Sequence, residues 1–420
     1  MKFCKHIEKI RDSHRKKKNE PAYTYSVFSN AQAIPADVWA TCNGNFNLFL
    51  SLSYLQTIEN LHANAMYFRY VIVYKDNKPA FIAYFQISDF TADAFSDTLQ
   101  PQLEEMQSKR SKLVEHYLDF NKNCVVLRIV TCGNNFISGA HAFSYNSLLE
   151  KEEAIAVLKN VVEMVGKSEK KHGKIAAIVV KDFEDGAGVE RPLLNEKFIE
   201  FFVEPNMVVH IPKKITSLDD YISLFSKKYR NRAKAIFKCA DGIEKHELSL
   251  AEIKKQSAKI YSLYEQIYNN AKFKVVKVAP TYFAEMKQSM QHQFVVSGYF
   301  KDGKLIAFKS AFILEDRIEA HFIGFDYELN KEHECYQNLL YDFIEFTIQN
   351  KKTILQLGRT AAEIKSTVGA KPQALFGYIK PQNHISKAVL KPFISFLQPS
   401  EWTPRNPFKE DVIVNSNAIV

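Results

Sequence analysis

Residues 294–314 read FVVSGYFKDGKLIAFKSAFIL, and this stretch decides the fold. Two apolar runs enclose the polar turn KDGK (301–304), a pattern typical of a β-hairpin. Residues 67–87, YFRYVIVYKDNKPAFIAYFQI, repeat the pattern around the turn KDNK (75–78). Because the two turns lie at a constant offset with apolar strands on both sides, the sequence indicates a duplicated domain.

The elements around the two hairpins follow a similar order. In the first half we predict a helix over 47–61, the hairpin, a polar insert over 89–121 that is helical through 103–120, a strand over 125–130, a helix over 151–170 and a strand over 175–180. In the second half we predict helices over 217–238 and 249–270, the hairpin, a strand over 317–325, a helix over 334–349 and a strand over 354–357. Each half therefore reads as helix, hairpin, strand, helix, strand.

Length and composition agree with two domains. The chain has 420 residues, and 46% of them are hydrophobic, which suffices for a core in each domain. We predict an α/β (α+β) fold in which each domain is a mixed twisted sheet flanked by helices. The expected parts are a flexible basic tail (1–22), an N-terminal domain (23–197), a C-terminal domain (198–385) that includes the basic helix 217–238, and a C-terminal extension (386–420).

The charge and cysteine patterns narrow the functional classes. The net charge of +9 suits a partner that carries phosphates, although it does not prove one. Residues 1–21 are charged throughout and have no apolar core, and no run reaches the ~20 apolar residues of a membrane span. The six cysteines show no C-x-x-C pairing. We therefore expect a cytoplasmic protein with reduced thiols and without a metal site.

The stretch TILQLGRTAAEIKSTVGAKP (353–372) is the strongest candidate for a ligand site. Its apolar run ends at Gly358, and Thr360 is a plausible N-cap for a helix of two turns. Arg359 and Lys365 then follow the carboxyl end of a strand, where open α/β sheets bind their ligands. The alternative is a surface helix with solvated charges, and the local pattern alone favours that alternative.

The helix expected over 217–238 is strongly basic. Its cations are Lys227, Lys228, Arg230, Arg232, Lys234 and Lys238. Residues four apart share a face of a helix, so these cations form two rows, and no acid balances them between 221 and 240. We predict a surface that binds the phosphates of tRNA or of a nucleotide-linked acceptor. A solvated face whose side-chain stems lie on the protein is the alternative.

Three polar residues interrupt the apolar strands of the second half. Lys309 lies mid-strand, which places it either on an exposed sheet face or in a cleft. Glu319 and His321 share a face of the next strand, beside Ile323. An acid and an imidazole in this place could act as a general base for an attacking amine. The alternative is a paired glutamate and a histidine that is satisfied in the core.

Together these features resemble the FemAB-like branch of the GNAT acetyltransferase superfamily, which includes the Fem-type enzymes of peptidoglycan synthesis. The segments that carry the resemblance are KKYRNRAKA, KLIAFKSAFIL, RIEAHFIGFDYELN and LGRTAAEIKSTVGAKP. The resemblance is good over residues 200–385 and weak over 25–190. It implies two tandem GNAT-like domains.

The resemblance also implies an activity, the transfer of an acyl or aminoacyl group from acyl-CoA or aminoacyl-tRNA to an amine. The acceptor would be a small molecule or a peptide. Lys365, followed by Val368 and Gly369, takes the place of a Fem-type lysine that stabilises negative charge in the transition state. Such a cation can contribute roughly 3 kcal/mol. By the same resemblance, Tyr336 would protonate a leaving thiolate.

One segment departs from the GNAT pattern. GNAT enzymes bind the pyrophosphate of coenzyme A with a Gly-rich loop before a helix. Here residues 330–336 read NKEHECY, which contains no glycine, and its acids would repel a pyrophosphate. Gly133 and Gly139 offer a weak phosphate cradle in the first half, although a plain turn is the more common meaning of such spacing.

Two alternatives to an enzyme remain open. The first is a binding protein on a GNAT scaffold that recognises a nucleic acid or a cell-wall precursor through its basic surface. The second is a partner protein whose duplicated domain mediates assembly, which a large exposed apolar patch would support. The sequence leaves the donor, the acceptor and the oligomeric state open.

Overall fold

The two expected hairpins are the centres of two separate sheets. The strands β3 (Met66–Lys75) and β4 (Lys78–Phe90) form the first hairpin, and β13 (Phe294–Lys301) and β14 (Lys304–Ile313) form the second. In both turns the two central residues have positive φ: 50° and 64° at Asp76 and Asn77, and 49° and 72° at Asp302 and Gly303. Two positive φ values are typical of a type I′ turn, whose twist matches that of the flanking strands.

The computed structural model covers the whole chain, and a defined part of it is described below. The described residues are 8–10, 23–43, 46–90, 118–119, 124–139, 141–184, 188, 190–195, 197–271, 276–383, 386–387, 390 and 401–410. Most of the expected tail (1–22), of the insert helix (103–120) and of the C-terminal extension (386–420) lies outside these residues. Within them, no helix combines the length and the apolar character that crossing a membrane requires.

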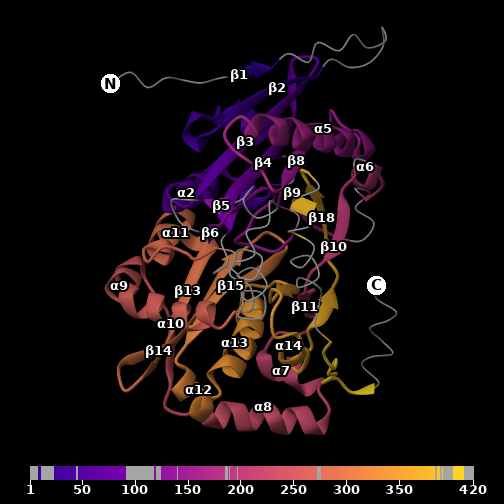
Figure 1. Cartoon of the computed structure of the whole chain (residues 1–420). Coiled ribbons are helices and arrows are strands. Elements are labelled where there is room, and N and C mark those ends of the chain that lie inside the picture. Colours follow the sequence, from indigo (N-terminus) through magenta and orange to yellow (C-terminus); the bar gives the residue numbers. More distant parts are fainter. Residues whose placement is uncertain are drawn as a thin grey trace. The chain divides into compact units, whose positions relative to one another are not determined.

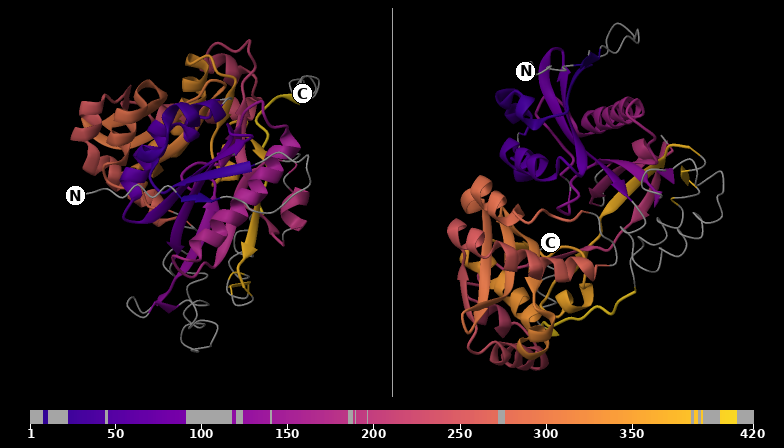
Figure 2. Two further views of the ribbon diagram at one scale, coloured as in Figure 1. Left: turned by 90° about the horizontal axis from the view of Figure 1, so that it is seen from above. Right: turned by 60° about the vertical axis from the view of Figure 1, so that its left-hand side comes forward.

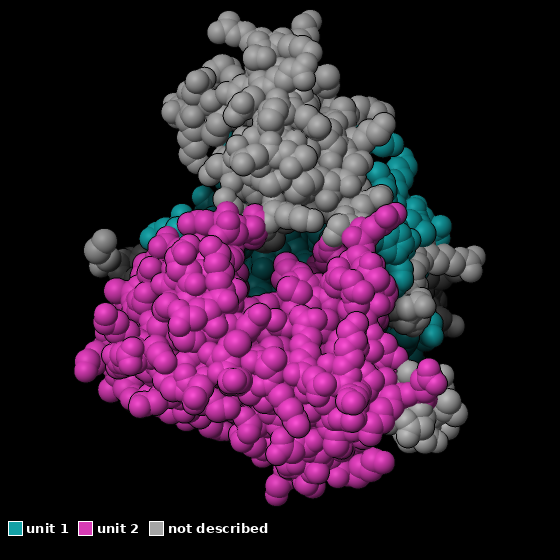
Figure 3. Space-filling model, turned by 90° about the horizontal axis from the view of Figure 1, so that it is seen from below, with its two compact units in different colours: residues 1–203, 272–278, 375–398 teal, residues 204–271, 279–374, 399–420 magenta. Residues whose placement is uncertain are grey.

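The chain forms two compact units, coloured teal and magenta in Figure 3. The first unit comprises residues 1–203, 272–278 and 375–398, and the second comprises 204–271, 279–374 and 399–420. Each unit contains one mixed sheet, so the predicted α/β class is confirmed.

The sheet of the first unit has the order β1-β2-β3-β4-β7-β9-β18-β10, and β8 pairs with β4. Its further strands are β1 (Glu8–Ile10), β2 (Tyr23–Phe28), β7 (Leu127–Cys132), β8 (Phe143–Tyr145), β9 (Ala177–Phe183), β10 (Ile199–Phe202) and β18 (Phe376–Pro381). Its helices are η1 (Ala31–Ala33), α1 (Ala36–Cys42), η2 (Leu48–Leu50), α2 (Leu52–His62), α5 (Lys151–Glu169) and α6 (Glu190–Asn195), and β5 (Leu118–Asp119) and β6 (Cys124–Val125) form a separate pair. Strands β7 and β9 are parallel.

Helix α5 covers one face of this sheet, as the amphipathic pattern over 151–170 predicts (Figure 2). Its apolar residues, among them Leu158 and Val161, enter the core with residues of β4, β7 and β9. Gly166 of α5 lies against the Ile178 side chain of β9. A Cβ atom at Gly166 would come within 2.1 Å of the end of that side chain, so a larger residue there would displace Ile178.

The sheet of the second unit has the order β12-β13-β14-β15-β16-β11-β17. Figure 1 labels β11, β13, β14 and β15 of this sheet. Its further strands are β11 (Asn206–His210), β12 (Glu244–Glu247), β15 (Arg317–Phe325), β16 (Ile354–Gln356) and β17 (Lys371–Gln373). Its helices are α7 (Leu218–Ser223), α8 (Lys227–Cys239), α9 (Leu250–Lys255), α10 (Ser257–Asn269), α11 (Tyr282–Met290), η4 (Gln291–Gln293), α12 (Tyr327–His333), α13 (Cys335–Gln349) and α14 (Ala362–Ser366). Apolar residues of α7, α8 and α13 share one core with residues of β11, β15 and β16, whereas α10 and α11 contact β13, β14 and β15.

The strand pairing differs from the sequence-based division of the chain. Residues 198–203 and 375–385 were expected in the second domain, but β10 and β18 pair with each other in the sheet of the first unit, where β18 also pairs with β9. Pro205 separates β10 from β11, as expected, and the two strands enter different sheets. An apolar run of four to six residues shows that a strand exists but not which sheet accepts it.

Two helices of the second unit begin and end elsewhere than predicted. The helix expected over 217–238 breaks into α7 and α8, because the C-terminal segment bonds at the break: Ser226 N donates to Pro407 O at 2.8 Å, and Lys409 N donates to Leu224 O at 3.0 Å. The helix expected to begin at Thr360 is shorter, and its N-cap is Ala361, with φ at 55°.

Candidate functional site

The parallel strands β15 and β16 part after a short contact. They share only three residue pairs, of which the last is Glu319 with Gln356. Strand β16 ends there, whereas β15 continues to Phe325 and pairs with β14. Residues 320–323 are partly exposed. Since ligands of α/β sheets bind beyond the carboxyl ends of parallel strands, this parting point is the candidate site.

A β-bulge lies on β15 next to the parting point. The pairing with β14 shifts around Ser310, whose hydroxyl accepts a hydrogen bond from Phe322 N at 3.0 Å and donates one to Phe322 O at 2.8 Å. The extra residue in the bulge shifts the alternation of β15, so the side chains after it point to the opposite face of the sheet from the one expected. Ile323 packs into the core on the α13 side, whereas His321 bonds to Tyr282 of α11. The expectation that Ile323 lies on the same face as His321 is therefore wrong.

Glu319 is buried at the point where the strands part. Its side chain is 2% exposed and lies 3.5 Å from Arg317 Nε. In the amide orientation that satisfies both groups, Gln356 donates to the Glu319 carboxylate at 2.6 Å. Burial raises the pKa of Glu319 to about 8, although Arg317 opposes this shift. A carboxyl group with this pKa gains and loses its proton close to neutral pH.

Lys365 lies in α14, on the segment that follows β16, and is 5% exposed. Its ammonium donates to Gly358 O at 3.2 Å and to Arg359 O at 3.3 Å. An ammonium has three N–H donors, and these two bonds use two of them. Burial lowers the pKa of Lys365 to about 7, so the side chain also titrates close to neutral pH.

Contacts around the end of β16 connect Glu319 with Lys365. Gly358 O accepts from Lys365 and also from Met207 N, at 3.1 Å. Asn206, next to Met207, is 1% exposed, and the Gln356 amide lies 3.2 Å from its amide. Sequence reasoning missed Asn206 and Gln356. A polar residue inside the apolar run ILQL was the one signal for Gln356, and nothing local indicated Asn206.

His321 and Tyr336 lie in apolar surroundings. His321 Nε2 lies 2.7 Å from the Tyr282 hydroxyl, and its ring packs on Phe322 at 4.1 Å between centroids. Burial lowers the pKa of His321 to about 3, which makes the ring a weak proton acceptor at neutral pH. Tyr336, near the start of α13, packs on Phe325 at 5.9 Å, and burial raises its pKa. Their catalytic roles remain predictions, and the geometry favours Glu319 over His321 as the base.

Lys309 is buried against α13. Its ammonium donates to Asp342 O at 2.7 Å and lies 4.9 Å from the centroid of the Phe343 ring. Burial lowers its pKa to about 8. This position is inside the core and not on an exposed face, so the geometry favours a structural role over the predicted contact with a ligand. Arg359 follows Gly358 directly and is half-buried.

The basic helix α8 exposes most of its cations. Ala233 and Ile236 form its buried side. Arg230 donates to Phe225 O at 2.5 Å, and Arg232 donates to the Gln337 side chain at 2.8 Å. The side chains that remain in solvent are Lys227, Lys228, Arg232, Lys234 and Lys238. This surface fits the predicted role in phosphate binding, which stays a prediction.

Comparison with known proteins identifies the architecture. No model of a protein family matches the chain, and neither does any curated protein sequence. The crystal structure of FemX matches with a TM-score of 0.52 and 12% identity, over 87% of this chain and 99% of FemX. The chain has the FemAB-like tandem GNAT fold.

Two further solved structures resemble this tandem GNAT fold. A tandem GNAT protein from the clavulanic acid biosynthesis pathway matches with a TM-score of 0.48 and 7% identity, over 86% of this chain and 99% of that protein. A conserved protein of unknown function from Bacteroides thetaiotaomicron matches with a TM-score of 0.46 and 11% identity, over 82% of this chain and 95% of that protein. The match to FemX confirms the fold implied by the sequence resemblance, and at 12% identity the likeness concerns the fold alone.

In the second GNAT-like unit, the protein's own groups occupy part of the start of α13. Helix α12 occupies most of the segment before α13, which the sequence did not predict. The side chain of Asn330 accepts from Tyr336 N at 2.9 Å and so uses one N–H of the first turn of α13. Glu334 is the N-cap residue of α13. An acidic, partly occupied helix end is a poor cradle for a dianion.

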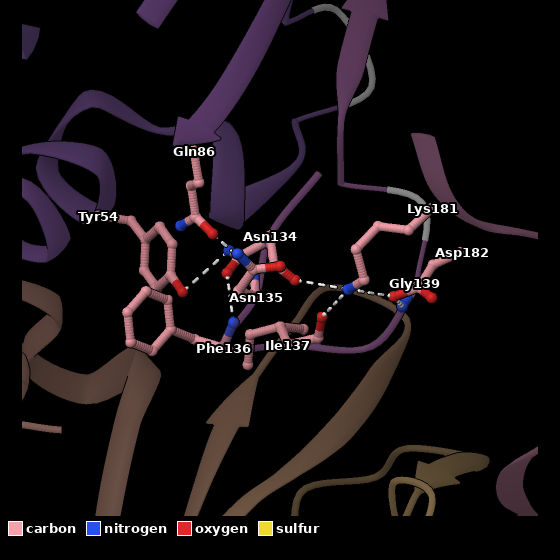
Figure 4. Close-up of polar contacts among 9 residues, drawn as sticks. All are labelled: Tyr54, Gln86, Asn134, Asn135, Phe136, Ile137, Gly139, Lys181 and Asp182. Carbon is pink, nitrogen blue, oxygen red and sulfur yellow. Dashed lines mark hydrogen bonds and ion pairs between the residues drawn. The ribbon is translucent and has the colours of Figure 1, made fainter. Parts of the chain in front are cut away.

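The corresponding loop of the first unit is closed by its own residues (Figure 4). It follows β7 over residues 133–139. Lys181 donates to Asn134 O at 2.7 Å and lies 2.6 Å from the Asp182 carboxylate, which accepts from Gly139 N at 3.2 Å. Gln86 accepts from the backbone N–H of residue 135 at 2.8 Å. Since these N–H groups have protein acceptors, the geometry favours a plain turn over a phosphate cradle.

A metal centre was not expected from the sequence. Among the residues that the structure describes, no group of three or more His, Cys, Asp or Glu side chains could hold a metal ion.

Proposed function

We propose that the chain is an acyltransferase that moves an acyl or aminoacyl group from a carrier to an amine on a small molecule or a peptide. The observation that carries the proposal is the pair of buried groups at the end of β16. Glu319 and Lys365 lie in one connected set of contacts, with pKa values of about 8 and about 7. Strongly shifted pKa values of this kind cluster at functional sites.

Each group has a defined role in the proposed reaction. The ionised Glu319 carboxylate accepts a proton from the ammonium group of the acceptor, which leaves a neutral amine with a nitrogen lone pair for attack. As the carbon–nitrogen bond forms, negative charge develops on the carbonyl oxygen of the donor. The Lys365 ammonium stabilises this charge, and such a contact contributes roughly 3 kcal/mol. The bond to the carrier then breaks, and the carrier leaves with a proton.

Of the two donors considered, acyl-CoA and aminoacyl-tRNA, the geometry favours aminoacyl-tRNA. The start of α13 offers an acidic and partly occupied helix end instead of a pyrophosphate cradle. Helix α8 exposes a row of cations, which suits the phosphates of a nucleic acid. Both donors are cytoplasmic molecules, so the proposal places the protein in the cytoplasm.

A ligand screen followed by a transfer assay tests the proposal. The melting temperature of the full chain is measured with coenzyme A, acetyl-CoA, longer acyl-CoA and an aminoacyl-tRNA pool, because a ligand of the native state raises it. We expect stabilisation by aminoacyl-tRNA and transfer of the labelled aminoacyl group to an amine. Full transfer by a folded Lys365→Ala variant would refute the assigned site.

A binding protein on the same scaffold is the second candidate, and the partly occupied start of α13 favours it. It predicts stabilisation by tRNA that does not depend on the aminoacyl group, together with no transfer to any amine. The proposed acyltransferase predicts transfer, so the two functions separate in one assay.

A further inference from the structure

A cavity of about 310 Å³ lies in the second unit, away from the parting point. Residues of α8, α13 and strands β12, β13 and β14 line it. Its inner wall is apolar and includes Phe237, Ile243, Ile306 and Ala307. It lies on the α13 side of the sheet, whereas alternation along β15 places Glu319 on the other face, because Ile318 belongs to the α13 core.

Charged residues of both signs stand together in the lining. Lys245 Nζ lies 2.6 Å from Asp342 Oδ1 and 2.9 Å from Glu345 Oε2. The side chain of Lys245 is 53% exposed, that of Asp342 is 12% exposed and that of Glu345 is 33% exposed. These three residues therefore form the rim of the cavity. Asp342 also bonds to Tyr299, which fixes its position.

We propose that this cavity binds a free amino acid with an apolar side chain, as the zwitterion. The ammonium of the ligand pairs with Glu345, and its carboxylate pairs with Lys245. The apolar side chain lies against Phe237 and Ile306. The exchange replaces one exposed ion pair, Lys245 with Glu345, by two pairs to the ligand, and an exposed pair costs little to open.

The size and the charge pattern together select this class of ligand. The volume of about 310 Å³ lies at the lower end of the range for small-molecule pockets, which suits a molecule of the size of leucine or phenylalanine. A purely apolar ligand would make no ion pair with the charged rim. A ligand with one charge would match either Lys245 or Glu345 but not both, whereas a zwitterion matches the pair.

The cavity is independent of the proposed transfer reaction, because none of its lining residues belongs to the contacts around the end of β16. The two can therefore be tested separately. Binding that survives in Lys365→Ala is expected for the cavity and excludes the transfer site as the place of binding.

The first experiment is titration calorimetry on the full chain. The probes are L-phenylalanine, L-leucine, N-acetyl-L-phenylalanine, which lacks the ammonium, and L-phenylalaninamide, which lacks the carboxylate. We expect both free amino acids to bind and both derivatives to bind at least about tenfold more weakly. No binding of the free amino acids, or equal binding of the derivatives, overturns the proposal.

Variants then locate the bound ligand. Glu345→Gln removes the rim carboxylate, and Ala307→Leu fills part of the cavity. Glu328→Gln, at an exposed position of α12, is the matched control. We expect a loss of at least about tenfold in affinity for the first two variants and none for the control. If Ala307→Leu does not fold, the affinities of Glu345→Gln and Glu328→Gln for L-phenylalanine are compared with each other. Equal affinity of these two variants refutes the site.

Discussion

Within the described part of the chain, each unit contains one parallel strand pair, and the two pairs end differently. In the first unit, β9 continues into Lys181 and Asp182, which bond to each other and to the loop after β7. In the second unit, Glu319 and Lys365 lie buried near the end of β16, with pKa values of about 8 and about 7. In the first unit the charges of Lys181 and Asp182 therefore stabilise a turn. In the second unit Glu319 and Lys365 titrate close to neutral pH.

This difference between the units supports our proposal that the chemistry takes place in the second unit. In the first unit, Lys181 and Asp182 pair with each other and bond to the loop, so both charges hold the turn in place. A buried group whose pKa lies close to neutral pH changes its protonation state at little cost, which general acid–base catalysis requires. We therefore expect substitutions at the two strand ends to have opposite consequences.

The largest expected effect follows from Lys365→Met, which keeps the volume of the side chain and removes its charge. Transfer should fall by roughly a hundredfold to a thousandfold, because the cation that stabilises the carbonyl oxygen is lost. The folded state should be retained, since an apolar side chain suits a position that is 5% exposed. The turnover rate and the melting temperature are measured together, with exposed Lys304→Met on the hairpin turn as the control. Transfer equal to that of the control would contradict the role of Lys365.

Glu319→Gln should lower transfer by at least roughly a hundredfold, because the amide cannot accept a proton. It should also change how stability depends on pH. Glu319 keeps its proton up to about pH 8 in the folded chain, whereas it loses it near its usual value of 4.5 when unfolded. This group therefore stabilises the fold fully below pH 4.5, and its contribution is lost as the pH rises to about 8.

The measurement is the free energy of unfolding of both proteins from pH 5 to 8. We expect that of the native chain to decline relative to Glu319→Gln across this range. A constant difference between the two would show that the pKa of Glu319 is not raised.

A stability effect is expected in the first unit. Lys181→Met removes the ammonium that lies 2.6 Å from the carboxylate of Asp182, a side chain that is 2% exposed. Breaking a buried pair in this way costs about 3 kcal/mol. Denaturant unfolding should show this loss, while transfer per folded molecule should stay unchanged. Lys197→Met, at an exposed position of the same unit, is the control. If Lys181→Met lost transfer activity but kept its stability, the first unit and not the second would carry the chemistry.

The sequence predicted those helices and hairpins that are encoded by neighbouring residues. The hairpins with their KDNK and KDGK turns, helix α5 and helix α13 form where apolar periodicity and turn chemistry agree. Arg359 and Lys365 were expected after a buried strand, and both follow β16. The reason is that a strand, a turn and a short helix are encoded by neighbouring residues.

Features that depend on distant residues were not predicted. The break between α7 and α8 is bonded by Pro407 and Lys409, far away in sequence. Strand β18 joins the sheet of the first unit, although most of the second unit precedes it in the chain. Asn206 belongs to β11, and the pairing of β11 with β16 brings it to the candidate site. The bulge on β15 depends on the hydroxyl of Ser310 on β14, which bonds to the backbone of Phe322. The periodicity of a single strand does not reveal such a contact.

The dependence of kcat/KM for transfer on pH tests the central claim most directly. The reaction needs ionised Glu319 and charged Lys365, so the rate should rise as Glu319 loses its proton and fall as Lys365 loses its own. With pKa values of about 8 and about 7, the profile should be a narrow bell centred halfway between them, at about pH 7.5. A rate that is flat from pH 6 to 9, or a profile that keeps both limbs in Glu319→Gln and Lys365→Met, would contradict the account.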